Sequence, residues 1–219
     1  MSTRSQQTGL TQTKQHGRYF LKSCRFGNTK KVLEILKSPI DINIRDNEAN
    51  TPLLLACSAA RDNVELCRIL VDRGADLEAT NKAGMNCLMR AAMTSNINVL
   101  EYLLSLPNHP DVSAVTNGGY TSLLFAASFA RRTRYKILQL LLSHGANLTN
   151  VPGTCDSALH LMLWSDYPCS CAEISLLLSA GASVDAVNAQ GRTPLLTLCC
   201  NHTFFERRVV ADRHPAALA

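Results

Sequence analysis

The sequence predicts an all-α solenoid of stacked helix pairs joined by β-turn fingers. A small polar residue followed by an apolar run recurs about every 35 residues along the 219-residue chain. A second apolar stretch at helical spacing follows in each of the first four of these blocks. This period favours stacking because one helix pair is too small to bury its own apolar face. The blocks open at Thr51, Asn86, Thr121, Ser157 and Thr193.

The segment before the first of these blocks holds one more expected repeat. Residues 17–36 contain the apolar patterns GRYFLKSC and KKVLEIL, which favour two helices, although a Thr-Pro start is missing. Residues 1–16 are polar and are expected to form a disordered tail.

The block that opens at Thr51 shows the expected unit most clearly. Thr51 can cap a helix through its hydroxyl, and Pro52 stands at the first helical position, where a missing N–H costs nothing. A short helix over Leu53–Ala59 is therefore expected, followed by a second helix over Val64–Val71. Gly74 supplies the left-handed residue that ends the second helix, and the chain then runs extended into a turn.

The later blocks repeat this unit with departures. Second helices are expected over Val99–Leu104, Ile137–Leu142 and Ile174–Leu178. Residues 108–110 (NHP) replace the usual Gly-Ala, so the preceding helix should end irregularly. The fourth and fifth repeats, at residues 121–156 and 157–192, are one residue longer than the others, and Val151–Cys155 is an atypical finger. The last block keeps TPLLTLCC but shows no clear second helix.

The expected domain organisation follows from these boundaries. A repeat domain over residues 17–200 lies between the tail of residues 1–16 and an irregular tail or degenerate cap over 201–219. Its repeats are expected at about 17–50, 51–85, 86–120, 121–156 and 157–192, with an incomplete sixth from 193.

Two segments carry a resemblance to a known family. TPLLLAC at residues 51–57 and VELCRILVDRGADLEA at residues 64–79 resemble an ankyrin repeat, with its TPLHLAA helix, VVKLLL helix and GADVNA link. The motif recurs five times, and the resemblance covers roughly residues 17–200. It implies a protein–protein interaction module whose partner binds the concave side, between the finger tips and the exposed ends of the first helices.

Carrying those positions over gives a candidate binding surface. Its members are Asn47, Glu48, Lys82, Met85, Met93, Tyr120, Phe129, Trp164 and Arg192. If the apolar members are exposed, they are anchors of the kind that dominate interfaces, with Glu48, Lys82 and Arg192 as a polar rim. The alternative is that the longer repeats fold over Phe129 and Trp164 and bury them in a satellite core.

Three other clusters have both a functional and a structural interpretation. The basic run at residues 131–136 is either an import signal or acidic-partner contact, or solvated charge in a turn, and the turn is favoured. Cys155, His160, Cys169 and Cys171 have zinc-ligand chemistry, but they belong to three separate places of the repeat. Asp156 and His160 with a nearby Ser or Cys would make a triad, yet no nucleophile elbow, phosphate loop or HExxH motif accompanies them. A non-enzyme without cofactor or metal is therefore expected.

Charge and composition limit the partners and the compartment. Residues 1–37 hold eight Lys/Arg against the single acid Glu34, whereas residues 38–200 hold eleven bases and fourteen acids, so no nucleic-acid face is expected for the solenoid. No stretch approaches the roughly 18 apolar residues of a membrane span. The nine cysteines are interpreted as thiols of a chain in the cytosol or nucleus.

The expected function is that of a monomeric scaffold or adaptor that binds one or more proteins through the concave groove. Two narrower alternatives use the same groove: the substrate-recognition arm of a ubiquitin ligase, and an inhibitor that covers a kinase or transcription factor. A segment that would recruit a ligase is not evident in the sequence.

Overall fold

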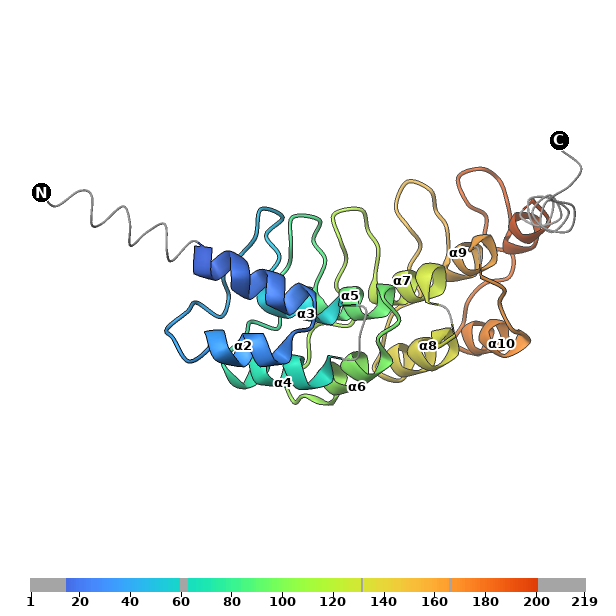
Figure 1. The fold of residues 1–219 in the computed structure, drawn as a ribbon. Helices are drawn as coiled ribbons and strands as arrows, with labels where there is room; N and C mark the ends of the chain where they lie inside the picture. The colour runs from blue at the N-terminus through green and yellow to red at the C-terminus, as the bar shows by residue number, and fades with distance from the viewer. Residues whose placement is uncertain (1–14, 60–62, 131, 166, 201–219) are drawn as a thin grey trace, which may run out of the picture.

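The computed structural model describes residues 15–59, 63–130, 132–165 and 167–200, and over these residues it contains helices and no strand. The helices form two layers, and long loops, the fingers, rise from the upper layer (Figure 1). The upper or inner layer contains helix 15–25, α3 (Pro52–Cys57), α5 (Cys87–Met93), α7 (Ser122–Phe129), α9 (Ala158–Trp164) and helix 194–200. The lower or outer layer contains α2 (Thr29–Ile35), α4 (Val64–Asp72), α6 (Ile97–Ser105), α8 (Arg134–Ser143) and α10 (Cys171–Ser179). The predicted solenoid of helix pairs and fingers is confirmed.

The inner helices that follow helix 15–25 start alike because each is capped by the residue that opens its block. The side-chain oxygen of that residue accepts the N–H of the residue three positions later, which satisfies one orphan donor of the helix. The pairs are Thr51 with Leu54, Asn86 with Met89, Thr121 with Leu124, Ser157 with His160, and Thr193 with Leu196. The caps expected from the sequence therefore fix the register of the stack.

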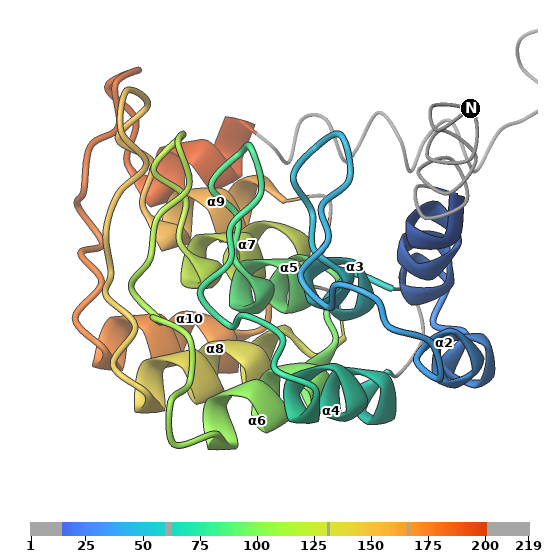
Figure 2. The same ribbon diagram turned by 90° about the vertical axis from the view of Figure 1, so that its left-hand side faces the viewer.

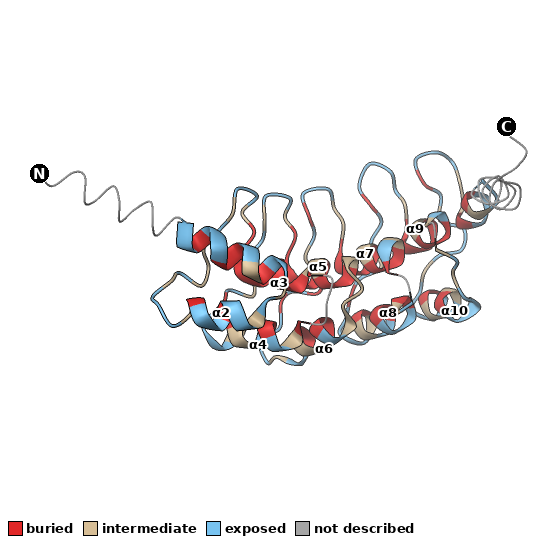
Figure 3. Ribbon diagram, in the orientation of Figure 1, coloured by how far each residue is buried: buried red, intermediate tan, exposed pale blue. Residues whose placement is uncertain are grey.

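Small and unbranched side chains allow the helices to approach closely. The inner helices α3, α5, α7 and α9 each contact the next one along the chain, and α4, α6, α8 and α10 form the corresponding outer row. Ala56, Ala91 and Ala126 are fully buried within the inner row, together with leucines such as Leu88. The buried faces point between the layers, whereas the finger tips are exposed (Figure 3). One hydrophobic core thus runs from Phe20 to Leu177.

The outer helices α4, α6, α8 and α10 end in two ways. After α4, α8 and α10, the glycines Gly74, Gly145 and Gly181 adopt φ values of +86°, +82° and +97°. Glycine suits this left-handed conformation because it has no Cβ. After α6 no glycine is present, and Leu106 instead turns extended at φ −71° and ψ 142°. The irregular end expected from the sequence before residues 108–110 is confirmed.

The basic run at residues 131–136 differs from the expectation of a solvated turn. Arg134 is 0% exposed. Its Nε donates to the carbonyl of Ala130 at 2.9 Å, and its Nη2 donates to Ser165 Oγ at 3.1 Å. Its Nη1 lies 3.9 Å from the carboxylate of Glu173. The interpretation as solvated charge is wrong for Arg134, because this guanidinium joins the start of α8 to the end of α9 and the start of α10.

Some expectations fall at or beyond the edges of the described chain. Helix 15–25 already includes residues 15 and 16, which were assigned to the tail. Helix 194–200 forms the first helix of the last block, whereas the expected cap or tail at 201–219 lies outside the described residues. Among the described helices, none is long and apolar enough to cross a membrane.

Candidate functional site

Four of the five described fingers are shaped by a side chain that bonds the backbone of the same finger. In the first finger Asp46 Oδ1 accepts the N–H groups of Glu48 and Asn50 at 2.9 and 2.8 Å. Asn81 and Asn188 do the same in the second and fifth fingers, and Thr116 Oγ1 accepts the N–H of Tyr120 in the third. Asx and Thr side chains stabilise turns in this way. The fingers are therefore ordered turns of repeated geometry.

Backbone hydrogen bonds join most fingers to their neighbours. The N–H of Lys82 donates to the carbonyl of Glu48 at 3.0 Å, and the N–H of Asn117 donates to that of Ala83 at 3.0 Å. The N–H of Ala189 donates to the carbonyl of Thr154 at 2.8 Å. A partner would meet this row of fingers as a preformed surface, which loses little entropy on binding.

The row is interrupted between the third and fourth fingers. In the fourth finger the residue at the donating position is Pro152, which has no N–H. The described residues accordingly show no backbone hydrogen bond between these two fingers, although the Pro152 ring packs so close to Gly119 that a Cβ there would clash with it. We call this break the finger seam.

Three aromatic rings lie in series beside the finger seam. The ring centroids of Tyr120 and Phe125 are 5.4 Å apart, and those of Phe125 and Phe129 are 6.1 Å apart, at interplanar angles of 31°. Tyr120 and Phe125 are half-buried, and Phe129 is 49% exposed. We call these residues the aromatic ladder. Phe125 was not among the expected site residues, although its spacing of four from Phe129 places both rings on one helix face.

The other apolar candidates differ in how far they are exposed to solvent. Trp164, at the end of α9, is 54% exposed, so the fourth and fifth repeats do not bury Phe129 and Trp164 in a satellite core. Met93 is half-buried at the end of α5. Met85 is 9% exposed, so its expected role as an exposed anchor is wrong. It closes the second finger, where its N–H and carbonyl both bond Asn81, and the residue is largely covered by the rest of the chain.

The polar candidates lie at two kinds of finger position. Asn47, Glu48 and Lys82 are exposed at the tips of the first two fingers. Arg192 is half-buried at the closing position of the fifth finger, where its carbonyl lies 2.9 Å from His160 Nε2. Only the first group is fully accessible to a partner.

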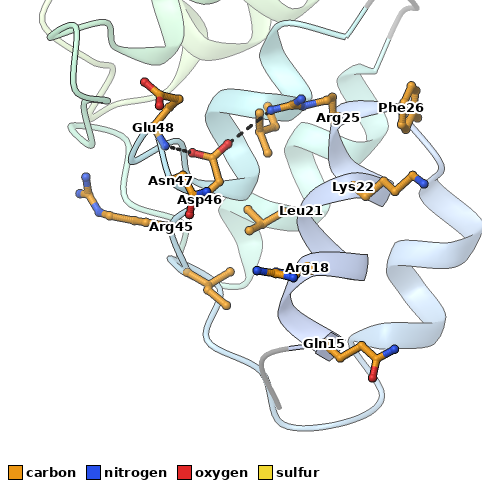
Figure 4. Close-up of a pocket in the computed structure, with 12 residues that line it drawn as sticks. Gln15, Arg18, Leu21, Lys22, Arg25, Phe26, Arg45, Asp46, Asn47 and Glu48 are labelled. Carbon is orange, nitrogen blue, oxygen red and sulfur yellow. Dashed lines mark hydrogen bonds and ion pairs between the residues drawn. The ribbon is translucent and has the colours of Figure 1, made fainter. Parts of the chain in front are cut away.

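An open pocket of about 1170 Å³ lies between helix 15–25 and the first finger, and we call it the N-terminal pocket. Figure 4 shows Arg18, Leu21 and Arg25 extending from the helix toward the finger. Gly17 brings the helix against Ile44, because a Cβ at this position would clash with the Ile44 side chain. The pocket was not expected from the sequence, because it depends on how closely the first helix approaches the finger.

His160 serves the structure on both of its ring nitrogens. The N–H of Ser157 donates to Nδ1 at 3.2 Å, so Nε2 carries the proton and donates to the Arg192 carbonyl. Ser157 Oγ lies 2.8 Å from Nδ1, but this buried hydroxyl also caps α9. Asp156 accepts from the side chain of Asn188. These groups join the fourth finger, α9 and the fifth finger, and both ring nitrogens form hydrogen bonds within the protein.

Comparison with known proteins places the repeat in a family. A family model described as ankyrin repeats (3 copies) matches residues 20–114 and 59–152, which together cover more than half of the chain. The chain belongs to the ankyrin-repeat family. A protein-binding module is the function class that this membership supports.

Individual relatives of this ankyrin-repeat chain differ widely in length. It is 28% identical over 178 residues, 77% of its length, to protein glp-1 of Caenorhabditis elegans, but it spans only 13% of that protein. It is 27% identical over 179 residues to the ankyrin repeat protein YahD of Escherichia coli (strain K12), covering 80% of this chain and 86% of that protein.

A solved structure shows the same fold. A chain in the complex of a predatory endopeptidase from Bdellovibrio bacteriovorus with an immunity protein matches with a TM-score of 0.71 and 23% identity. The match covers 85% of this chain and 93% of that chain. At this identity the likeness establishes the fold alone.

Proposed function

We propose that this ankyrin-repeat chain is a protein–protein interaction module whose partner binds along the concave side, where the fingers meet the inner helices. Figure 2 shows the fingers standing at an angle to the helix layers, so that the two enclose a continuous concave side. We propose residues 17–200 as the binding unit, with the repeat boundaries given above.

The observation that carries the proposal is the exposure of aromatic side chains at the ends of two successive inner helices. Phe129 ends α7 and Trp164 ends α9, and both are about half exposed. Fully burying an aromatic side chain contributes about 1.5–3 kcal/mol. A partner that covers these two side chains would therefore gain binding free energy from their burial. Neighbouring rings of the aromatic ladder hold Phe129 in place, which reduces the entropy lost on binding.

The remaining candidate residues have supporting roles in this proposal. Tyr120 and Met93 extend the apolar surface toward the fingers, and Asn47, Glu48 and Lys82 form its polar rim. Arg192 contributes at the edge of the fifth finger. The structural neighbour is a chain from a complex of an endopeptidase with an immunity protein, which favours a protein partner for this fold as well. The buried cysteines Cys24, Cys57, Cys67 and Cys87 are free thiols, as suits a protein of the reducing cytosol or nucleus.

The test compares partner capture by the chain and two variants from the source cell. Phe129→Ser and Trp164→Ala should each remove specific partners that the unchanged chain retains. Tyr135→Ala is the matched control, because Tyr135 is an exposed aromatic residue on the outer helix α8. Capture of the same proteins by all three variants would contradict the proposal.

The two narrower functions are separated by the identity of the captured proteins. A substrate-recognition arm should co-purify with cullin or elongin subunits in a manner that survives Trp164→Ala, since that contact uses another surface. An inhibitor should instead abolish the activity of a captured kinase or transcription factor at one-to-one stoichiometry and lose this effect in the variant.

A further inference from the structure

We propose that the N-terminal pocket binds an acidic stretch of the partner, with carboxylates on its cationic rim and an apolar side chain on its floor. The inference rests on the proposed concave-side function and adds the chemistry of the partner segment. It assigns the two ends of the concave side different tasks, because the aromatic ladder and Trp164 lie further along the stack.

The floor of the pocket is formed by apolar side chains, two of which are largely buried. Leu21 and Leu55 line it and are largely buried within the core, and Ile44 lines it beside Gly17. An opening of this size holds several side chains, and binding pockets in general combine such apolar walls with a few placed polar groups. The floor therefore suits an aliphatic side chain of a peptide.

The rim of the pocket carries four cationic residues against two acidic ones. The cationic residues are Arg18, Lys22, Arg25 and Arg45. Arg25 is engaged with Asp46 at 3.4 Å, and Arg45 donates to the carbonyl of Thr80 at 2.9 Å. Within the described chain, the cationic side-chain groups of Arg18 and Lys22 form no ion pair.

Arg18 and Lys22 stand four residues apart on helix 15–25, where two like charges repel each other. Leu21 and Arg25 follow on the same face, so the helix presents a cationic stripe above the apolar floor (Figure 4). A carboxylate bound beside both side chains would attract each of them and offset their mutual repulsion. Binding of an acidic segment is therefore favoured at this point of the concave side.

The two acids of the pocket do not neutralise the stripe. Burial opposes the ionisation of Asp46, but hydrogen bonds from the Asn50 side chain and from the N–H groups of Asn50 and Glu48, with the Arg25 charge, lower its pKa below the ordinary value. Asp46 is thus ionised and already satisfied by its own finger and by Arg25. Glu48 is exposed at the finger tip.

The chain's own first segment lacks the matching charge. Residues 1–14 contain Arg4 and Lys14 and no acidic residue, so this segment does not complement a cationic rim. A nucleic acid would match the charge, but it offers no aliphatic side chain for the floor. An acidic peptide with an apolar residue satisfies both halves of the pocket.

The experiment measures fluorescence polarisation of a fluorescein-labelled peptide, with leucine flanked on each side by three glutamates, against the full chain. The matched peptide carries glutamine in place of glutamate. The acidic peptide should bind saturably and more weakly as salt rises, and the glutamine peptide should bind at least about tenfold more weakly. Equal binding of the two peptides would overturn the proposal.

Paired variants locate the binding. Arg18→Ala with Lys22→Ala should weaken the acidic peptide by about tenfold, since two rim charges are removed. Lys30→Ala with Lys37→Ala removes the same charge from exposed positions outside the pocket and should leave binding unchanged. Equal weakening by both pairs contradicts the pocket. Arg18→Glu with Lys22→Glu should reverse the preference toward a lysine-containing peptide, which a merely misfolded variant would not do.

Two further measurements separate this inference from the concave-side function. A labelled single-stranded oligonucleotide that binds more tightly than the acidic peptide, with the same dependence on Arg18 and Lys22, would overturn the acidic-peptide assignment. Peptide binding that persists while Phe129→Ser and Trp164→Ala both leave partner capture unchanged refutes only the concave-side proposal. Loss of captured partners in Trp164→Ala with no peptide binding refutes only the pocket.

Discussion

At the scale of single residues, the side chains that open and close the repeats were more predictable than those that join them. Thr51 and Thr121 follow from local rules, because a hydroxyl directly before an apolar helix has one favourable use. Arg134 depends on neighbours that are distant in the sequence. Ser165 and Glu173 approach Arg134 only after the repeats stack, so no local pattern marks this arginine as buried.

Arg134 gives the residue-scale prediction. Replacing it with alanine leaves the Glu173 carboxylate, itself largely buried, without its cation and removes the hydrogen bonds to Ala130 and Ser165. Removing one partner of a buried ion pair typically costs about 3–5 kcal/mol. We expect Arg134→Ala to lower the free energy of unfolding by about 3 kcal/mol in urea denaturation, because Glu173 also accepts the N–H of Ser170 at 2.7 Å and so keeps one partner.

Arg132→Ala is the control for this measurement, since Arg132 belongs to the same basic run and is exposed. Exposed substitutions usually change the free energy of unfolding by less than about 0.5 kcal/mol. Similar midpoints for the two variants would show that the guanidinium of Arg134 contributes nothing to the joint between α8, α9 and α10.

At the scale of elements, the helices and fingers were predicted from the sequence but the surface was predicted only in part. The helix pairs follow from apolar periodicity, and the irregular end of α6 follows from the missing glycine. The candidates Phe129 and Trp164 are exposed, as their interpretation as interface anchors requires. The N-terminal pocket was missed because the approach of helix 15–25 to the first finger is a tertiary distance, whereas Phe125 has a local signal in its spacing of four from Phe129.

The row of fingers gives the element-scale prediction. Lys82, Asn117 and Ala189 donate their N–H groups to the preceding finger, whereas Asn47 holds the same position in the first described finger and has no finger before it. A hydrogen-bonded amide exchanges only when the bond opens. We expect the amides of Lys82, Asn117 and Ala189 to exchange more slowly with deuterium than the amide of Asn47, as measured by NMR at residue resolution.

At the finger seam the same experiment has no amide to measure. Pro152 contributes no amide, so the carbonyl of Gly118 has no donor from the fourth finger among the described backbone groups. Exchange that is equally fast at all four amides would mean that the fingers move independently, and the preformed surface assumed for binding would be lost.

At the scale of the whole molecule, the main contacts among the described helices α3 to α10 join neighbours in the stack. The inner helices α3, α5, α7 and α9 follow one another in space as they do along the chain, and so do the outer helices. Stability of such a stack is close to a sum of repeat terms and nearest-neighbour interfaces. A defect in the middle should therefore act differently from the same defect near an end.

Two fully buried leucines allow this comparison with one kind of substitution. Leu88 lies in α5, which has α3 on one side and α7 on the other, whereas Leu177 lies in α10, the last outer helix described. Replacing a buried leucine with alanine costs about 2–5 kcal/mol. Trp164, in the neighbouring α9, reports on the end of the stack, while circular dichroism reports on all helices.

We expect Leu88→Ala to shift the Trp164 fluorescence and circular-dichroism transitions together, since the central interface couples both halves of the stack. Leu177→Ala should move the Trp164 transition to lower urea than the circular-dichroism transition, because the terminal repeat can open while α3, α5 and α7 keep their contacts. Coincident transitions in Leu177→Ala would show instead that the stack unfolds as one unit, and that coupling reaches beyond nearest neighbours.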